Sequence, residues 1–129
     1  MWNGHSVCVI LPTYNEKDSI RQVIADFFAT GVVDEVMVIN NNAAAGTSEE
    51  VAGTGAVEIH EQRQGYGNAI RRGLSESDRD YLIICEPDAT FLASDVFKLL
   101  AYAADFDIVY GSRTSQQLIW QGANMGLFL

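Results

Sequence analysis

The chain has 129 residues, of which 48% are hydrophobic, and it carries a formal net charge of -9 at pH 7. This length and apolar content suit one modest globular domain with its own core. The negative charge would repel nucleic acid and disfavours a nucleic-acid-binding function. Any phosphate chemistry would depend on a bound metal or on a few local cations, chiefly Arg63, Arg71, Arg72 and Arg113.

The first elements alternate between strand and helix. Residues 6–11, SVCVIL, form a β-branched run typical of a strand that is covered on both faces. In residues 17–31 the apolar positions recur every three or four residues, which predicts an amphipathic helix. Residues 35–40, EVMVIN, predict a second strand. Thr47 stands three residues before Glu50, the spacing of a capping box, and predicts a short helix.

The alternation of strands and helices continues up to the last segment of the chain. Residues 56–61 and 80–85 predict two more strands, and the apolar positions of 66–74 trace one face of a helix between them. A further helix is expected over 96–103 and a fifth strand over 107–112. Strands and helices in this order predict an open, largely parallel α/β sheet with helices on both faces.

Cys8 and Cys85 both lie inside apolar runs, where a free thiol behaves as a small hydrophobe. We expect both in the core and no disulfide framework, which fits a reducing compartment. The first apolar run ends at Pro12 and is too short for a signal sequence or a membrane span. The last segment, QQLIWQGANMGLFL, follows no clear period and suggests a chain cut short or a tail that packs on something else.

Polar or glycine-bearing loops follow all five predicted strands. Open parallel sheets bind ligands outside the carboxyl ends of their strands, so these loops are expected to line one rim. In order they are PTYNE, NNNAAAGTS, QRQGYGNA, EPDAT and GSRTS. The first loop has no glycine, and the chain has no GxxxxGK[ST] motif, so neither a dinucleotide fingerprint nor a phosphate loop is supported.

The segment EPD places Glu86 and Asp88 two residues apart after the fourth strand. Residues two apart in an extended segment project to the same side, and Pro87 favours that extension. Two adjacent carboxylates repel unless a cation lies between them or one is protonated. A divalent ion such as Mg²⁺ or Mn²⁺, completed by substrate phosphates, would supply that cation. A solvated acidic turn is the alternative, and spacing alone does not separate the two.

Three side chains in other loops are suited to binding a nucleoside diphosphate. The Tyr14 ring could stack on a base, and Glu16 could accept hydrogen bonds from a loop or a ribose. The guanidinium of Arg113 could clamp a diphosphate. Taken singly, Tyr14 is more often a turn aromatic and Arg113 more often a surface charge.

Taken together, these loops resemble the family 2 glycosyltransferases of the GT-A fold, the group that includes dolichyl-phosphate mannose synthase and many bacterial cell-wall enzymes. The motifs that carry the resemblance run in the family's order over residues 7–114 and are VILPTYNE, VINNNAAAGT, GYGNAIRRG, EPD and GSR. The resemblance implies a Rossmann-like α/β fold with an open, mostly parallel sheet flanked by helices. It also implies metal-dependent, inverting sugar transfer.

Roles for single residues follow from the same resemblance. Pro12, Tyr14, Glu16, Asn40 and Arg63 would bind the nucleotide-sugar. Glu86 and Asp88 would hold Mg²⁺ or Mn²⁺, and Asp88 and Arg113 would act on the reacting diphosphate. Asn40 stands where the family usually has an aspartate, and Ala43 to Ala45 replace a Ser-Thr-Asp sequence.

Family members generally continue beyond this length, so residues 1–129 are interpreted as the donor-binding domain of a longer catalytic domain, truncated at the C-terminus. The acceptor would be a lipid phosphate or a saccharide. We expect a cytoplasmic protein, or one at the cytoplasmic face of a membrane, because nucleotide-sugars are made in the cytoplasm. A non-catalytic nucleotide-sugar-binding module is the alternative, since no catalytic base can be identified in the chain.

Overall fold

The computed structural model describes residues 1–111. The chain divides into two compact units, Met1–Val96 and Phe97–Leu129. The helices and strands are β1 (Val7–Thr13), α1 (Lys17–Ala29), β2 (Glu35–Asn40), α2 (Thr47–Val51), β3 (Val57–His60), α3 (Tyr66–Glu76), β4 (Tyr81–Ile84), a 3-10 turn (Ala93–Asp95) and α4 (Val96–Tyr102).

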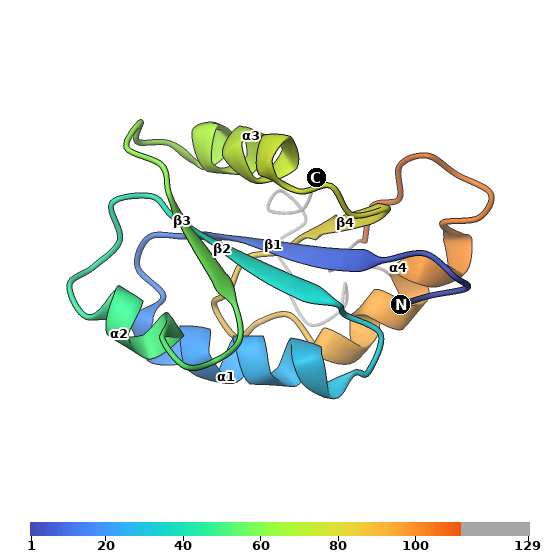
Figure 1. Cartoon of the computed structure of the whole chain (residues 1–129), viewed down its shortest axis with the longest axis horizontal. Coiled ribbons are helices and arrows are strands. Elements are labelled where there is room, and N and C mark those ends of the chain that lie inside the picture. Colours follow the sequence, from blue (N-terminus) through green and yellow to red (C-terminus); the bar gives the residue numbers. More distant parts are fainter. Residues whose placement is uncertain (112–129) are drawn as a thin grey trace, which may run out of the picture. The chain divides into compact units, whose positions relative to one another are not determined.

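The first unit is built on a four-stranded sheet in the order β3-β2-β1-β4, and every neighbouring pair is parallel (Figure 1). Central strand β1 is fully buried, and its Ile10 is in register with Met37 of β2 and Ile84 of β4. The open, parallel sheet predicted from the alternation of elements is therefore confirmed. In such a sheet the carboxyl ends of all the strands lie at the same end of the sheet.

Helices cover both faces of the sheet, with α3 on one side and α1 and α2 on the other (Figure 1). On the α3 side, a core cluster joins alternate residues of β1 and β2 to the helix: Cys8, Ile10, Met37, Ile39 and Ala69. Because side chains alternate along a strand, Val9 and Leu11 point to the opposite face. The buried stripe of α1 contains Ile20, Val23, Ile24 and Phe27.

Two local predictions are wrong. Residues 107–111 form no strand in the part of the chain that the structure describes, and Ile108 and Tyr110 are 71% and 84% exposed. A run of β-branched and aromatic residues favours a strand only where a neighbouring strand completes its hydrogen bonds. Helix α2 does form, but its N-cap is Gly46 with φ 93°, and Thr47 donates to the carbonyl of Ala44 instead of forming a capping box.

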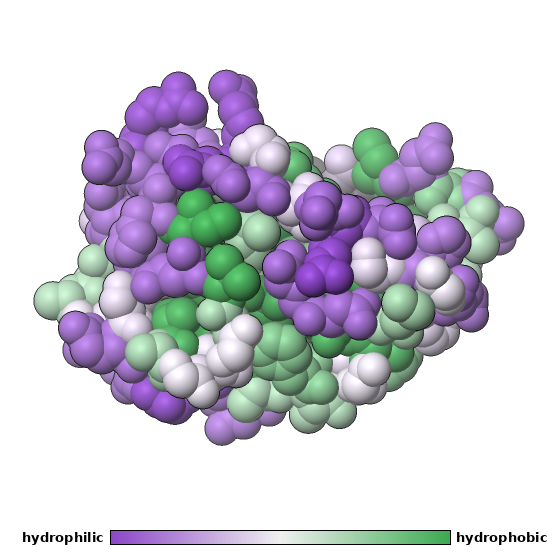
Figure 2. Space-filling view, in the orientation of Figure 1, coloured by the Kyte–Doolittle hydropathy of each residue, from purple (hydrophilic) through white to green (hydrophobic). Residues whose placement is uncertain are grey.

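Strand β3 lies at one edge of the sheet, and its side chains are less buried than those of β1 and β2. Figure 2 shows apolar residues at the surface over this strand, where Val57 is 43% exposed. Within residues 1–111, no helix has both the length and the apolar character needed to cross a membrane.

Two carboxylates fix the start of β1 from either side. Asp34, just before β2, accepts the N–H of Val7 at 2.8 Å, and Asp80, just before β4, accepts the N–H of Ser6 at 2.8 Å. These bonds favour the ionised carboxylates. The bond from Val7 is the main cause that lowers the pKa of Asp34, and the bond from Ser6 is the main cause that lowers the pKa of Asp80, each below the ordinary value of 3.8.

We expect part of the stability of the fold to be lost in acid through these two groups. A carboxyl whose pKa is lower in the folded state stabilises fully above its unfolded pKa and loses that contribution as the pH falls through its folded pKa. Asp34→Asn should therefore lower the free energy of unfolding by about 1 kcal/mol at neutral pH and flatten its decline below about pH 4. Urea denaturation across pH measures both, with exposed Asp26→Asn as the control; equal pH slopes in both variants would contradict the assignment.

The thiol of Cys8 lies in the core, and that of Cys85 is also buried, as predicted. Burial raises the pKa of Cys8 to about 12. Because the thiolate is the reactive form, we expect Cys8 to resist alkylation at neutral pH until the protein unfolds. Mass spectrometry after iodoacetamide treatment with and without urea tests this, and modification of Cys8 in the native protein would refute it.

Candidate functional site

A cavity of about 260 Å³ opens at the carboxyl ends of the strands. Its lining residues come from the end of β1, the segments after β2 and β4, the β3–α3 loop and the start of α3: Pro12, Thr13, Tyr14, Glu16, Asn41, Gln64, Tyr66, Ala69 and Glu86. Four of the five predicted loops thus contribute to one cavity. This is the position at which open parallel sheets bind ligands.

The β1–α1 loop is held by the carboxylate of Glu16. Its Oε2 atom accepts the backbone N–H groups of Tyr14 and Asn15, each at 2.7 Å. Glu16 is also the N-cap of α1, and its carbonyl accepts the N–H of Ile20 at 2.9 Å. The loop is therefore fixed to the helix, and it presents the Tyr14 ring 56% exposed at the cavity. An exposed ring at a cavity wall can stack on a flat ligand.

The segment after β4 is anchored on both sides of Glu86. The N–H of Cys85 donates to the carbonyl of Ile10 at 3.2 Å, and the Ser19 hydroxyl of α1 donates to the carbonyl of Pro87 at 2.6 Å. Glu86 lines the cavity between these two anchors. The acidic segment therefore has a defined place beside the β1–α1 loop.

Asp88 is half-buried and begins a tight turn. Its Oδ1 atom accepts the N–H of Thr90 at 3.1 Å and the hydroxyl of Thr90 at 2.6 Å, and Ala89 between them has φ 68°. Among the described residues that line the cavity, Glu86 is present and Asp88 is not. Within residues 1–111, no three His, Cys, Asp or Glu side chains gather into a group able to hold a metal ion. Two carboxylates completed by ligand phosphates remain a suitable donor set for Mg²⁺ or Mn²⁺.

Asn40 and Arg63 lie outside the described lining of this cavity. The Asn40 Nδ2 atom donates to the carboxylate of Glu58 at 2.9 Å, and its Oδ1 atom accepts the N–H of Ala43 at 2.8 Å. Arg63 is an exposed side chain whose Nε atom lies 3.9 Å from Glu61. Their roles in nucleotide binding stay predictions, as does that of Arg113, which lies outside the described residues.

The sequence interpretation missed several lining residues, above all Asn41, Gln64 and Tyr66. Asn41 follows Asn40, the last residue of β2, and strand alternation does not indicate which of the two faces a cavity where the strand ends. Gln64 and Tyr66 flank the first glycine of GYG. That motif indicated a loop but did not assign a role to the side chains in it.

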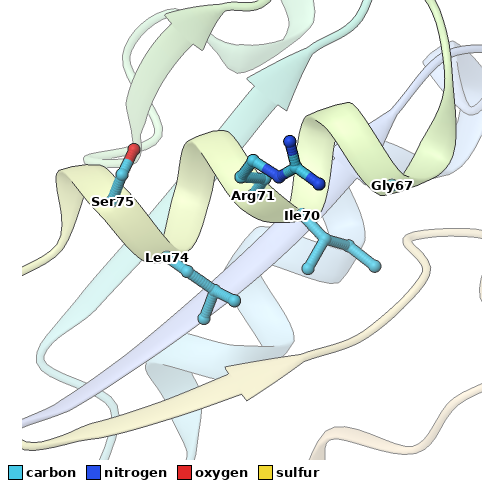
Figure 3. Close-up of a pocket in the computed structure, with 5 residues that line it drawn as sticks. All are labelled: Gly67, Ile70, Arg71, Leu74 and Ser75. Carbon is cyan, nitrogen blue, oxygen red and sulfur yellow. The ribbon is translucent and has the colours of Figure 1, made fainter.

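A second, larger hollow of about 510 Å³ lies on α3. It is lined by Gly67, Ile70, Arg71, Leu74 and Ser75, and Figure 3 shows Ile70 and Leu74 pointing from the same side of the helix. All five residues come from one helix, and no strand end contributes to the described lining. The smaller cavity is the better candidate for chemistry because it gathers carboxylates and aromatic rings from several loops.

Curated relatives match most of this chain. Protein RfbJ of Shigella flexneri is 30% identical over 115 residues, which is 88% of this chain and 89% of RfbJ. Glycosyltransferase AglJ of Haloferax volcanii is 32% identical over 110 residues, 84% of this chain and 36% of AglJ. The chain therefore spans nearly all of one relative but about a third of the other.

The fold matches solved structures as well. Glucosyl-3-phosphoglycerate synthase from Mycobacterium tuberculosis superposes with a TM-score of 0.71 at 23% sequence identity, over 79% of this chain and 40% of the synthase. The family model described as "Glycosyl transferase family 2" matches residues 8–124. The ordered loop motifs and the parallel sheet thus lead to the same assignment: this chain belongs to glycosyl transferase family 2.

Proposed function

We propose that this chain binds a nucleotide-sugar and takes part in transferring its sugar to an acceptor hydroxyl or phosphate. The observation that supports this most strongly is the single cavity that joins Tyr14, Glu16 and Glu86 at the carboxyl ends of the strands. An exposed aromatic ring suits the base, and the acidic segment suits the diphosphate through a divalent ion. We infer a UDP- or GDP-sugar as the donor.

Glu86 and Asp88 would hold the divalent ion. The synthase from M. tuberculosis, which shares this fold, has been crystallised with Mn²⁺ and UDP and also with Mg²⁺ and UDP. When bound, the ion would neutralise the charge that grows on the departing nucleoside diphosphate. The protein would position the donor through the loops that Glu16 and Ser19 hold in place. Arg113 is proposed to share the diphosphate charge.

In the proposed reaction, an acceptor oxygen attacks the anomeric carbon, the bond from that carbon to the diphosphate breaks, and the configuration inverts. The acceptor proton passes to a base that we do not assign to this chain. A lipid phosphate or a saccharide would be the acceptor, and the reaction would occur in the cytoplasm or at the cytoplasmic face of a membrane. Residues 1–129 would form the donor-binding domain.

A non-catalytic nucleotide-sugar-binding module is the second candidate. It is favoured by Asn40, which stands where the family usually has an aspartate and whose Nδ2 atom donates to Glu58. Both candidates require nucleotide-sugar binding, but only the first would transfer the sugar to an acceptor.

Calorimetric titration of this chain with UDP- and GDP-sugars in the presence of Mn²⁺ or Mg²⁺ tests the shared requirement. Binding of one donor class is expected, and no binding of any nucleotide-sugar would reject both candidates. Release of nucleoside diphosphate in the presence of polyprenyl phosphate or saccharide acceptors then separates an enzyme from a binding module.

A further inference from the structure

Asn41 is a polar side chain in the cavity wall that is only 4% exposed. Its carboxamide uses both of its functions within the protein. The Nδ2 atom donates to the carbonyls of Glu61 at 2.9 Å and Arg63 at 2.8 Å. The Oδ1 atom accepts the N–H of Gly65 at 2.9 Å and the side-chain amide of Gln64 at 3.3 Å.

The backbone of Asn41 extends this network to the neighbouring strand ends. Its N–H donates to the carbonyl of Thr13 at the end of β1 at 3.0 Å, and its carbonyl accepts the Gln64 amide at 3.3 Å. One residue therefore joins β1, β2 and the loop of residues 61–65. That loop supplies Gln64 to the cavity and leads into α3, which supplies Tyr66.

We propose that Asn41 is a positioning residue, which holds residues 61–65 in the conformation that forms the donor cavity. This inference rests on the proposed function and identifies how one wall of the site is held. Asn41 needs no contact with the nucleotide for this role, because its hydrogen-bonding atoms are already used by the loop.

The role requires a carboxamide. An ionised aspartate at position 41 would keep the acceptor for Gly65 but would lose the donor, so its second oxygen would face the carbonyls of Glu61 and Arg63. A protonated aspartic acid has one O–H donor and could restore one of those two bonds. Burial and the facing carbonyls would raise the pKa of such an aspartic acid. The charged groups around it are Glu61, whose carboxylate lies 3.7 Å from Arg72 and 3.9 Å from Arg63, and, along the same cavity, Glu16 and Glu86.

We therefore expect the variant Asn41→Asp to bind UDP with Mn²⁺ about 10- to 100-fold more weakly than the wild type at about pH 7.5, the range expected for unsatisfied buried groups. The ratio of the two affinities should approach one as the pH is lowered to about 5.5, because the introduced carboxyl gains its proton. Comparing the two proteins at each pH removes the effect of acid on Glu86, which both contain.

Two further variants separate positioning from other effects. Asn3→Asp makes the same charge change at an exposed residue in the turn before β1, outside the described lining of the cavity, and should bind UDP nearly as well as the wild type at every pH. Asn41→Ala removes the carboxamide without adding charge, and its weaker binding should not recover in acid. A pH-independent loss in Asn41→Asp, or an equal loss in Asn3→Asp, would overturn the proposal.

A second measurement reports on the loop without any nucleotide. Hydrogen exchange should show the Gly65 amide protected in the wild type and exposed in Asn41→Ala, which lacks the Oδ1 acceptor of that amide. Protected amides in β1 would show that the variant is folded. If the wild type binds no nucleotide, the proposed function fails, while the exchange result still decides whether Asn41 holds the loop. Unchanged Gly65 protection in Asn41→Ala would reject the positioning role.

Discussion

Replacing Glu86 by glutamine should remove the dependence of nucleoside diphosphate binding on a divalent ion. Glutamine keeps the size and the hydrogen-bonding ability of the side chain but loses the charge that a hard cation requires. We expect the affinity for UDP in the presence of Mn²⁺ to fall by at least about tenfold, the scale of losing one charge-assisted contact. Asp88→Asn should weaken binding too, and isothermal titration calorimetry measures both.

A suitable control is Asp78→Asn, which removes an exposed carboxylate from the segment that precedes β4, at the opposite end of that strand from Glu86. This variant carries the same change in net charge but should bind UDP and Mn²⁺ as the wild type does. Equal losses in Asp78→Asn and Glu86→Gln would indicate a general effect of charge. Unchanged binding in Glu86→Gln would show that the acidic segment does not take part in binding.

Gly73→Val should destabilise the fold strongly, because α3 packs directly against β1 at this residue. A Cβ atom built on Gly73 would lie 2.5 Å from Cγ2 of Ile10, a fully buried β-branched side chain in the middle of the sheet. Relief of that overlap requires α3 to move off the sheet or Ile10 to leave its rotamer. Overpacking of this kind costs about 3 kcal/mol of unfolding free energy at the upper end of its usual range.

The same helix offers a matched control. A Cβ atom built on Gly67 meets nothing within 4 Å in the part of the chain that the structure describes. Gly67→Val should therefore change the unfolding free energy by less than about 0.5 kcal/mol, since valine has a slightly better helix propensity than glycine. Urea denaturation followed by circular dichroism measures both variants. Similar stabilities for the two would contradict the close packing of α3 against Ile10.

The sheet and the helices on its two faces could be predicted from the sequence because burial leaves a regular pattern of apolar residues. The run from Val7 to Leu11 is apolar at every position, and β1 is indeed an inner strand that is buried along its whole length. The periodic stripe that contains Ile24 and Phe27 faces the core in α1. These features depend on sequence-local periods of two and 3.6 residues, which survive without knowledge of the neighbours.

The features that were missed depend on partners that a local sequence pattern does not identify. The run at 107–111 has strand-like residues, but strand formation also requires a paired neighbour, which propensity does not reveal. Thr47 has the spacing of a capping box, yet its hydroxyl finds the carbonyl of Ala44. Asn41 lines the cavity and is held there by hydrogen bonds to residues twenty or more positions away, in the loop before α3.

The central claim is that the cavity beside Glu86 binds a nucleoside diphosphate through a divalent ion. Calorimetric titration of this chain with UDP, once with Mn²⁺ and once with the metal removed by a chelator, tests it most directly. We predict measurable binding with Mn²⁺ and at least about tenfold weaker binding with the chelator, as expected when paired charges lose their bridging cation. Equal affinity under both conditions would contradict the claim.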